Sequence, residues 1–130
     1  MKFSLIILDG PSSSQSSQTA LAFAKAALAT GHELFRVFFA NDGVLHGSTL
    51  STPPQDEINI TEDWQRFVTQ HEVDTVVCVA ASLRRGLLNE QEAERYQKPA
   101  ANLADAIELA GLGQLIEATL SSDRVLTFGS

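Results

Sequence analysis

The stretch KFSLIILDGPSSSQSSQTALAFAKAALATGHELFRVFFA (residues 2–40) decides the fold. Residues 2–8 form a mainly apolar run that ends at an Asp-Gly-Pro turn, as is typical of a strand buried on both faces. A loop rich in Ser and Gln covers residues 12–18, and the alanine-rich residues 19–30 predict a helix that stops at the following Gly. Residues 33–40 are again of β type. This order predicts a βαβ unit, and therefore a parallel sheet with a right-handed crossover.

The middle of the chain continues the alternation of strands and helices. Residues 41–58 contain Asp-Gly and Pro-Pro pairs and predict a short helical turn followed by an irregular loop. Asn59 is suited to cap a helix, with Glu62 three residues later. The apolar residues of that helix recur at helical spacing: Ile60, Trp64, Phe67 and Val68. Residues 74–80 (DTVVCVA) predict the third strand.

The C-terminal part of the chain completes the predicted domain. An acidic helix is expected near residues 90–96. Residues 106–110 fit a helix or a strand by periodicity, and we interpret them as a strand because helices flank them on both sides. A helix over residues 112–120 and a strand over residues 124–128 follow. We predict a single α/β domain over residues 1–130, doubly wound, with about five mostly parallel strands and helices on both faces.

Charge and composition exclude several classes of function. Nine Lys and Arg against sixteen Asp and Glu give a formal charge of −7, which argues against direct binding of nucleic acid and against adhesion to anionic membranes. No apolar run approaches the roughly 20 residues of a membrane span, and the short N-terminal run lacks the cleavage site of a signal peptide. The three histidines are far apart, so we expect no metal site, and no motif indicates a cofactor.

The chain has a single cysteine, Cys78, near the predicted carboxyl end of the third strand. One thiol excludes an intramolecular disulfide, a Cys-Cys zinc site and a C-x-x-C pair, and we expect a cytoplasmic protein. Arg84 and Arg85 follow within seven residues, and a helix is expected to begin beyond Ala81. Nearby cations and a helix start favour a thiolate. The alternative is an inert core cysteine, because the flanking Val-Val-Cys-Val-Ala is strongly apolar.

Other polar segments give weaker signals. Cys78 and Arg84 have the Cys-x5-Arg spacing of cysteine phosphatases, but the intervening residues contain no glycine for a tight amide cradle. The Ser-rich loop over residues 12–17 stands where a nucleotide-binding domain holds phosphate, yet it lacks both phosphate-loop fingerprints, so we favour a helix-capping loop. His46, in the loose loop, is the one histidine retained as a site candidate, and Asp42 is interpreted as a turn residue.

Several segments together resemble the DsrE/TusD family of sulfur-relay proteins. The matching stretches, which span nearly the whole chain, are Lys2-Phe3, Gly10-Pro11, GHELFRVFF (31–39), Asp42-Gly43-Val44, CVAASLRRG (78–86), GLGQLIEA (111–118) and DRVLTF (123–128). The segment around Cys78 is far more specific than Cys-x5-Arg alone. Two departures are Ala40, where an aromatic is usual, and Ser82, which replaces a small apolar residue.

The resemblance implies a sulfurtransferase in which Cys78 carries a persulfide. It implies a small sulfur-carrier protein as donor, another protein thiol as acceptor, and supporting roles for Arg84 and Arg85 in binding the anionic sulfur or the partner. It also implies assembly with two smaller homologous subunits into a heterohexamer. TusD-like members serve 2-thiouridine formation in tRNA, which is the expected pathway here, and DsrE-like members serve cytoplasmic sulfur oxidation.

Three interpretations therefore remain open at the level of sequence. The first is the persulfide-carrying transferase. The second is a non-catalytic assembly subunit in which Cys78 is buried. The third, a cysteine phosphatase acting through Cys78 and Arg84, requires an anion-binding loop between these two residues.

Overall fold

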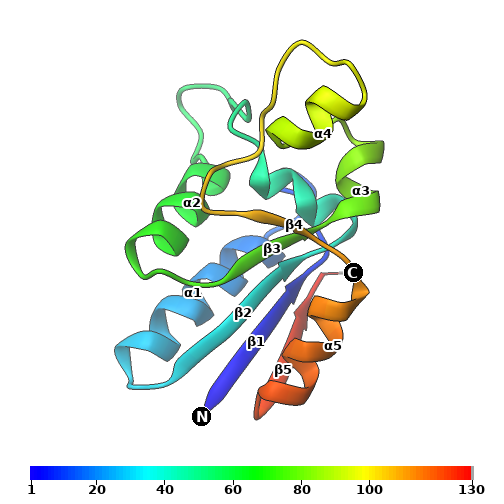
Figure 1. Cartoon of the computed structure of the whole chain (residues 1–130). Helices are drawn as coiled ribbons and strands as arrows, with labels where there is room; N and C mark the ends of the chain where they lie inside the picture. The colour runs from blue at the N-terminus through cyan, green and yellow to red at the C-terminus, as the bar shows by residue number, and fades with distance from the viewer. Residues whose placement is uncertain (130) are drawn as a thin grey trace.

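The computed structural model describes residues 1–129 and contains a five-stranded sheet in the order β4-β3-β2-β1-β5 (Figure 1). The strands are β1 (Lys2–Ile7), β2 (Glu33–Phe39), β3 (Thr75–Cys78), β4 (Glu108–Ala110) and β5 (Arg124–Phe128). All four pairings in this sheet are parallel. The predicted α/β fold with a parallel sheet is confirmed.

Helices lie on both faces of the sheet, as predicted. They are α1 (Ser16–Ala29), the 3-10 helix η1 (Asn41–Gly47), α2 (Ile60–Gln70), α3 (Val79–Arg84), α4 (Glu90–Arg95) and α5 (Leu112–Ser121). From β1 to β4 the chain advances in one direction across the sheet, whereas the step from β4 to β5 returns past β1. Because crossovers between parallel strands are right-handed, that reversal places α5 on the face opposite α1 and α2 (Figure 1).

The larger core fills the space between the sheet and the pair α1 and α2. Leu5, Ile7 and Phe39 point into it from the strands, and Trp64 of α2 is fully buried among them. The Trp64 indole N–H donates to the carbonyl oxygen of Ser17 at 3.1 Å, so the polar edge of this large ring is satisfied. This packing joins the two helices to one another and to the sheet.

A smaller apolar cluster lies under α5, around Phe38, Val76 and Ala110. The buried Arg36 guanidinium stands at its border and contacts Asp74 at 2.6 Å and Glu117 of α5 at 3.0 Å. Only Ala118 of α5 is fully buried. Helix α5 therefore covers the smaller apolar cluster on this face of the sheet only in part.

Element boundaries differ from the predicted ones by more than one residue in three places. Helix α1 begins at Ser16 and not at residue 19, and β4 is confined to Glu108–Ala110. The third strand ends at Cys78, and α3 starts at once, whereas the sequence predicted a strand to residue 80 and a helix beyond Ala81. The pairing of β3 with β4 stops at Cys78 and Ala110, and α3 begins at Val79, where the following Ala80 and Ala81 favour the helical state.

The loose segment after β2 is as predicted, a helical turn followed by an irregular stretch up to the N-cap Asn59. Its turn is η1, which packs against α2, α3 and the strands β2 and β3. The backbone of Gly43 lies so close to the carbonyl of Ile7 that a Cβ at position 43 would overlap it. Glycine therefore lets η1 sit directly on the carboxyl edge of the sheet.

Candidate functional site

Cys78 is the last residue of β3 and the N-cap residue of α3. Its backbone pairs with Ala110 of β4, and its side chain packs against the edges of both apolar clusters. The thiol is half-buried, so it is neither sealed in the core nor free on a loop. Because strands of a parallel sheet end at a common edge, this position is where α/β proteins hold their functional groups.

Arg84 and Arg85 lie at the far end of α3 from Cys78. Six residues at about 1.5 Å rise place them roughly 9 Å along the helix axis from the cysteine. Arg85 Nε donates to Asp42 Oδ1 at 2.9 Å, and its Nη1 donates to the carbonyl oxygen of Ala81 at 3.1 Å. The Arg84 side chain is exposed, and it makes no ion pair with any residue in the range 1–129. No hydrogen bond joins either guanidinium to Cys78 within that range.

The helical state of residues 79–84 removes the phosphatase interpretation. A Cys-x5-Arg site needs a loop whose amide groups and arginine converge on one anion above the thiolate. Here the intervening residues form α3, and the helix separates Cys78 from Arg84 by its whole length. The Cys-x5-Arg spacing is present in the sequence, but the anion-binding loop that a phosphatase requires is not formed.

His46 is a core residue and not an accessible site residue. It lies in η1, is fully buried, and its ring centroid is 5.1 Å from that of Phe39. Its Nε2 lies 3.3 Å from the carbonyl oxygen of Asp9, to which it can donate. Burial lowers the pKa of His46 to about 4, against a weaker raising effect of that hydrogen bond, so the imidazole is neutral at pH 7.

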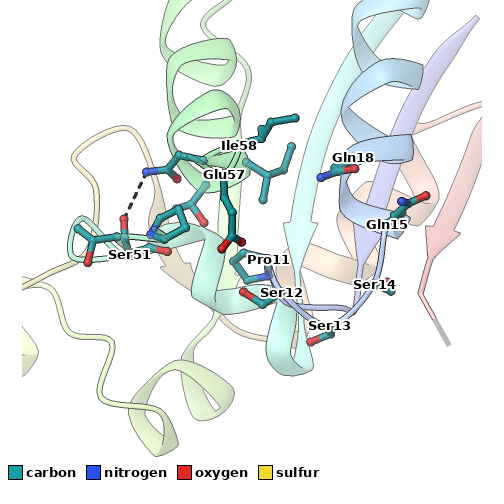
Figure 2. A pocket seen from close by; sticks show the side chains of 14 residues that line it. Pro11, Ser12, Ser13, Ser14, Gln15, Gln18, Ser51, Glu57 and Ile58 are labelled. Carbon is teal, nitrogen blue, oxygen red and sulfur yellow. Dashed lines mark hydrogen bonds between the residues drawn. The ribbon is translucent and has the colours of Figure 1, made fainter. Parts of the chain in front are cut away.

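The Ser-rich loop borders a pocket of about 620 Å³ between the N-terminal ends of α1 and α2 (Figure 2). Ser14 Oγ donates to Asp9 at 2.6 Å and accepts from the amide N–H of Ser16 at 3.1 Å, which ties the loop to the start of α1 as a capping loop would. Glu57 extends toward Pro11 and Ser12 (Figure 2), and none of the described lining residues is Lys or Arg. The lining therefore supplies no cation for a phosphate.

A second hollow lies next to α3. A groove of about 490 Å³ runs between α3 and the segment that follows α4, and it is lined by Leu83, Arg84, Gly86, Leu88, Tyr96 and Lys98. Tyr96 and Lys98 could not be identified as site residues from the sequence. They follow the acidic α4, more than ten residues beyond Arg84, and no periodicity relates them to Cys78.

Residues 1–129 contain neither a metal-binding cluster nor a membrane-spanning helix. No group of three or more His, Cys, Asp or Glu side chains is arranged to hold a metal ion. No helix in the same range is long and apolar enough to cross a membrane.

The fold and the site define a doubly wound parallel α/β protein with one half-buried thiol at the carboxyl edge of its sheet. The chain belongs to the DsrE/DsrF-like family, whose model matches residues 1–128. The relatives include the putative sulfurtransferase DsrE of Allochromatium vinosum, 50% identical over 99% of both chains. A sulfurtransferase TusD homolog of Pseudomonas aeruginosa is 49% identical over 99% of this chain and 98% of its own. The expectation of a sulfurtransferase of this family is thus confirmed.

Solved structures agree with the fold. The crystal structure of the YchN protein from E. coli superposes with a TM-score of 0.76 at 26% identity, covering 98% of this chain and all of its own. A protein of unknown function from Methanobacterium thermoautotrophicum has the same fold, with a TM-score of 0.67 at 12% identity.

Proposed function

We propose that this sulfurtransferase relays sulfane sulfur as a persulfide on Cys78. The observation that carries the proposal is the place of the single cysteine of the chain, half-buried at the carboxyl edge of the sheet and at the start of α3. A sulfurtransferase that holds its cargo covalently on cysteine has no other thiol to use in this sequence. Partial exposure admits a second sulfur atom, and partial burial shields the persulfide once it has formed.

The proposed transfer is a balanced exchange between two sulfur centres. The Cys78 thiolate attacks the terminal sulfur of a carrier persulfide, R–S–SH, and forms a new S–S bond. The S–S bond of the carrier breaks, and its electron pair leaves on the carrier sulfur as R–S⁻. Cys78–S–SH then gives its outer sulfur to an acceptor thiolate by the same step, and Cys78 leaves as the thiolate. No oxidant or reductant is consumed.

The two arginines have separate roles in this proposal. Arg85 bonds Asp42 and the α3 backbone, so it holds the helix that begins at Cys78 against η1. Arg84 is exposed at the end of α3 and is free to meet an incoming partner. Because α3 separates both guanidinium groups from the Cys78 thiol, neither contacts the sulfur directly. Either group can stabilise an anion only when a partner approaches.

We further propose that the chain acts in the cytoplasm within a heterohexamer with two smaller homologous subunits. Support comes from α5, whose outer face exposes three apolar residues one turn apart: Leu112, Ile116 and Leu120. A contiguous exposed apolar stripe of this kind marks a protein contact. Donor and acceptor would be small sulfur-carrier proteins, and formation of 2-thiouridine in tRNA is the proposed pathway, with sulfur oxidation as the alternative.

A second candidate function is that of a non-catalytic assembly subunit. It draws on the packing of Cys78 against both apolar clusters, which lowers the accessibility of the thiol. The two candidates differ in one measurable property. A transferase requires Cys78 to react in the folded state, and an assembly subunit does not.

The test is to load the folded protein with glutathione persulfide and to weigh the intact chain. The transferase predicts a gain of one sulfur atom that a thiol acceptor removes again. Cys78→Ser, a nearly isosteric change, abolishes the gain and leaves the circular dichroism spectrum unchanged. A wild-type thiol that takes up no sulfur while the protein is folded contradicts the proposal and favours the assembly subunit.

A further inference from the structure

The groove beside α3 combines apolar walls with cations. Leu83 and Leu88 supply the aliphatic wall, and the Tyr96 ring, 51% exposed, covers another side. Exposed apolar surface of this kind, bordered by polar groups, is typical of a site that another molecule covers.

Charge distinguishes this groove from the rest of the surface. The chain carries a formal charge of −7, yet the two charged residues that line the groove are Arg84 and Lys98. Both are exposed, and neither has an ion-pair partner in the part of the chain that the structure describes. By contrast, Arg36, Arg66, Arg85 and Arg95 are each paired with a carboxylate. Lys2, Lys25 and Arg124 also lack an ion pair among the described residues, but none of them lines this groove. Unpaired cations in an acidic protein attract an acidic partner.

We propose that this groove docks an acidic segment of the sulfur-carrier protein that exchanges sulfur with Cys78, an inference that rests on the proposed relay function. An aliphatic side chain of the segment packs against Leu83, Leu88 and Tyr96. Carboxylates on either side of it pair with Arg84 and Lys98. The groove fixes the orientation of the carrier, and Cys78 carries out the chemistry.

The length of α3 determines how far apart the anchoring side chain and the sulfur-bearing cysteine of the carrier must be. Cys78 and Arg84 mark the two ends of the helix, roughly 9 Å apart along its axis. An extended chain advances about 3.3 Å per residue, so about three residues separate the anchoring side chain of the carrier from its sulfur-bearing cysteine. A carrier in which the two are adjacent could not fill the groove and reach the thiol together.

Nucleic acid is the other partner that cations beside an aromatic ring suggest, and the surroundings disfavour it. The helix α4 lies directly before Tyr96 and carries Glu90, Glu92 and Glu94. A phosphate backbone requires an extended row of cations, and here it would pass these carboxylates instead. A short acidic peptide can pair with two cations and end before α4.

The test uses the isotope-labelled full chain and a synthetic probe, N-acetyl-Glu-Leu-Glu-Gly-Gly-Ser-amide. Titration should shift the amide resonances of Leu83, Gly86, Leu88 and Lys98 in a saturable way. Lys98→Glu should weaken binding by about five- to tenfold, because it turns an attraction into a repulsion at an exposed site. Lys25→Glu is the matched control, since this lysine is equally charged and exposed but lies on α1. It should leave the affinity nearly unchanged.

Two further arms complete the test. The charge-reversed peptide, with Lys in place of both Glu, should not bind, and a single-stranded oligouridine should not shift the groove resonances. Equal binding of both peptides, shifts that map elsewhere, or groove shifts caused by the oligouridine would each overturn the proposal. Loading of Cys78 by glutathione persulfide does not involve the groove. Normal loading without peptide binding therefore refutes the docking site alone, whereas failed loading refutes the relay function.

Discussion

Arg85 Nε donates to Asp42 Oδ1 at 2.9 Å and thereby ties the end of α3 to η1, across 43 positions of sequence. The neighbouring Arg84 points into the groove and has no such partner within the described residues. Two adjacent arginines that look equivalent in sequence thus differ in their contacts. One supports the helix that follows Cys78, and the other faces the solvent where a partner would arrive.

The pair Asp42 and Arg85 should contribute modestly to stability. The Arg85 side chain is 31% exposed and that of Asp42 58%, so solvent screens the charges. A double-mutant cycle with Asp42→Ala and Arg85→Ala, measured by urea unfolding, should give a coupling free energy of about 0.5 kcal/mol. A coupling indistinguishable from zero would mean that the contact does not hold α3 in solution.

Replacing Arg84 should affect the partner and not the fold. Arg84→Ala should leave the free energy of unfolding within about 0.5 kcal/mol of wild type, because the side chain is exposed. It should slow sulfur transfer from a protein carrier several-fold and leave loading by glutathione persulfide unchanged. Stopped-flow measurement of both rates is the check, with Arg66→Ala as the control at an exposed arginine on α2. Equal slowing with both donors would place Arg84 in the chemistry instead.

Much of this architecture could be predicted from the sequence, since the apolar runs, the helical stripes and the glycine stops are local signals. The strand predicted within the ambiguous residues 106–110 is present, over Glu108–Ala110, and it could be predicted because the alternation of elements required one. The end of the third strand was predicted two residues too late. Apolar character continues past Cys78, and the length of β4, which limits the pairing, is not visible in the β3 sequence.

The candidate site was predicted only in part. The position of Cys78 at the sheet edge follows from the pattern, whereas the partner of Arg85 does not, because Asp42 looks like an ordinary turn residue before Gly43. His46 is a site candidate in the sequence because it lies in a loose loop, but η1 folds that loop back over Phe39 and buries the ring. Contacts between loops depend on the assembled sheet, and no local pattern encodes them.

Replacing Ser82 with Ala should stabilise the folded protein. It is fully buried in α3, and its hydroxyl has no hydrogen-bond partner within residues 1–129. A buried unsatisfied hydroxyl is unfavourable, and Ala fits the same space with a higher helix propensity. Ser82→Ala should raise the free energy of unfolding by about 1 kcal/mol, measured by urea denaturation. A loss of stability would show that the hydroxyl has a partner in solution, for example a bound water.

His46 should make the protein less stable in mild acid. Its pKa is lowered to about 4 in the folded state, from 6.5 when unfolded, so between these values the unfolded chain binds more protons. Stability is therefore full above pH 6.5 and is lost as the pH falls toward 4. Between pH 7 and pH 5 this histidine should account for a loss of about 2 kcal/mol. His46→Gln should remove that part of the loss, as seen by urea unfolding at both pH values, and an unchanged pH dependence would contradict the assignment.

The stripe on α5 should control assembly without affecting the chemistry of the thiol. Ile116 and Leu120 are 59% and 81% exposed, although both are large and apolar, and α5 lies on the face opposite α1 and α2. A charge buried at a subunit contact is strongly unfavourable, so Ile116→Glu with Leu120→Glu should prevent association with the two smaller homologous subunits proposed above. Analytical ultracentrifugation of the mixture would then show the variant as a monomer. Ile58→Glu is the matched control, because Ile58 is 71% exposed but lies before α2. Sulfur loading of Cys78 from glutathione persulfide should be the same in all three proteins. If the double variant still co-sediments with those subunits, the assembly contact lies on another face of the molecule.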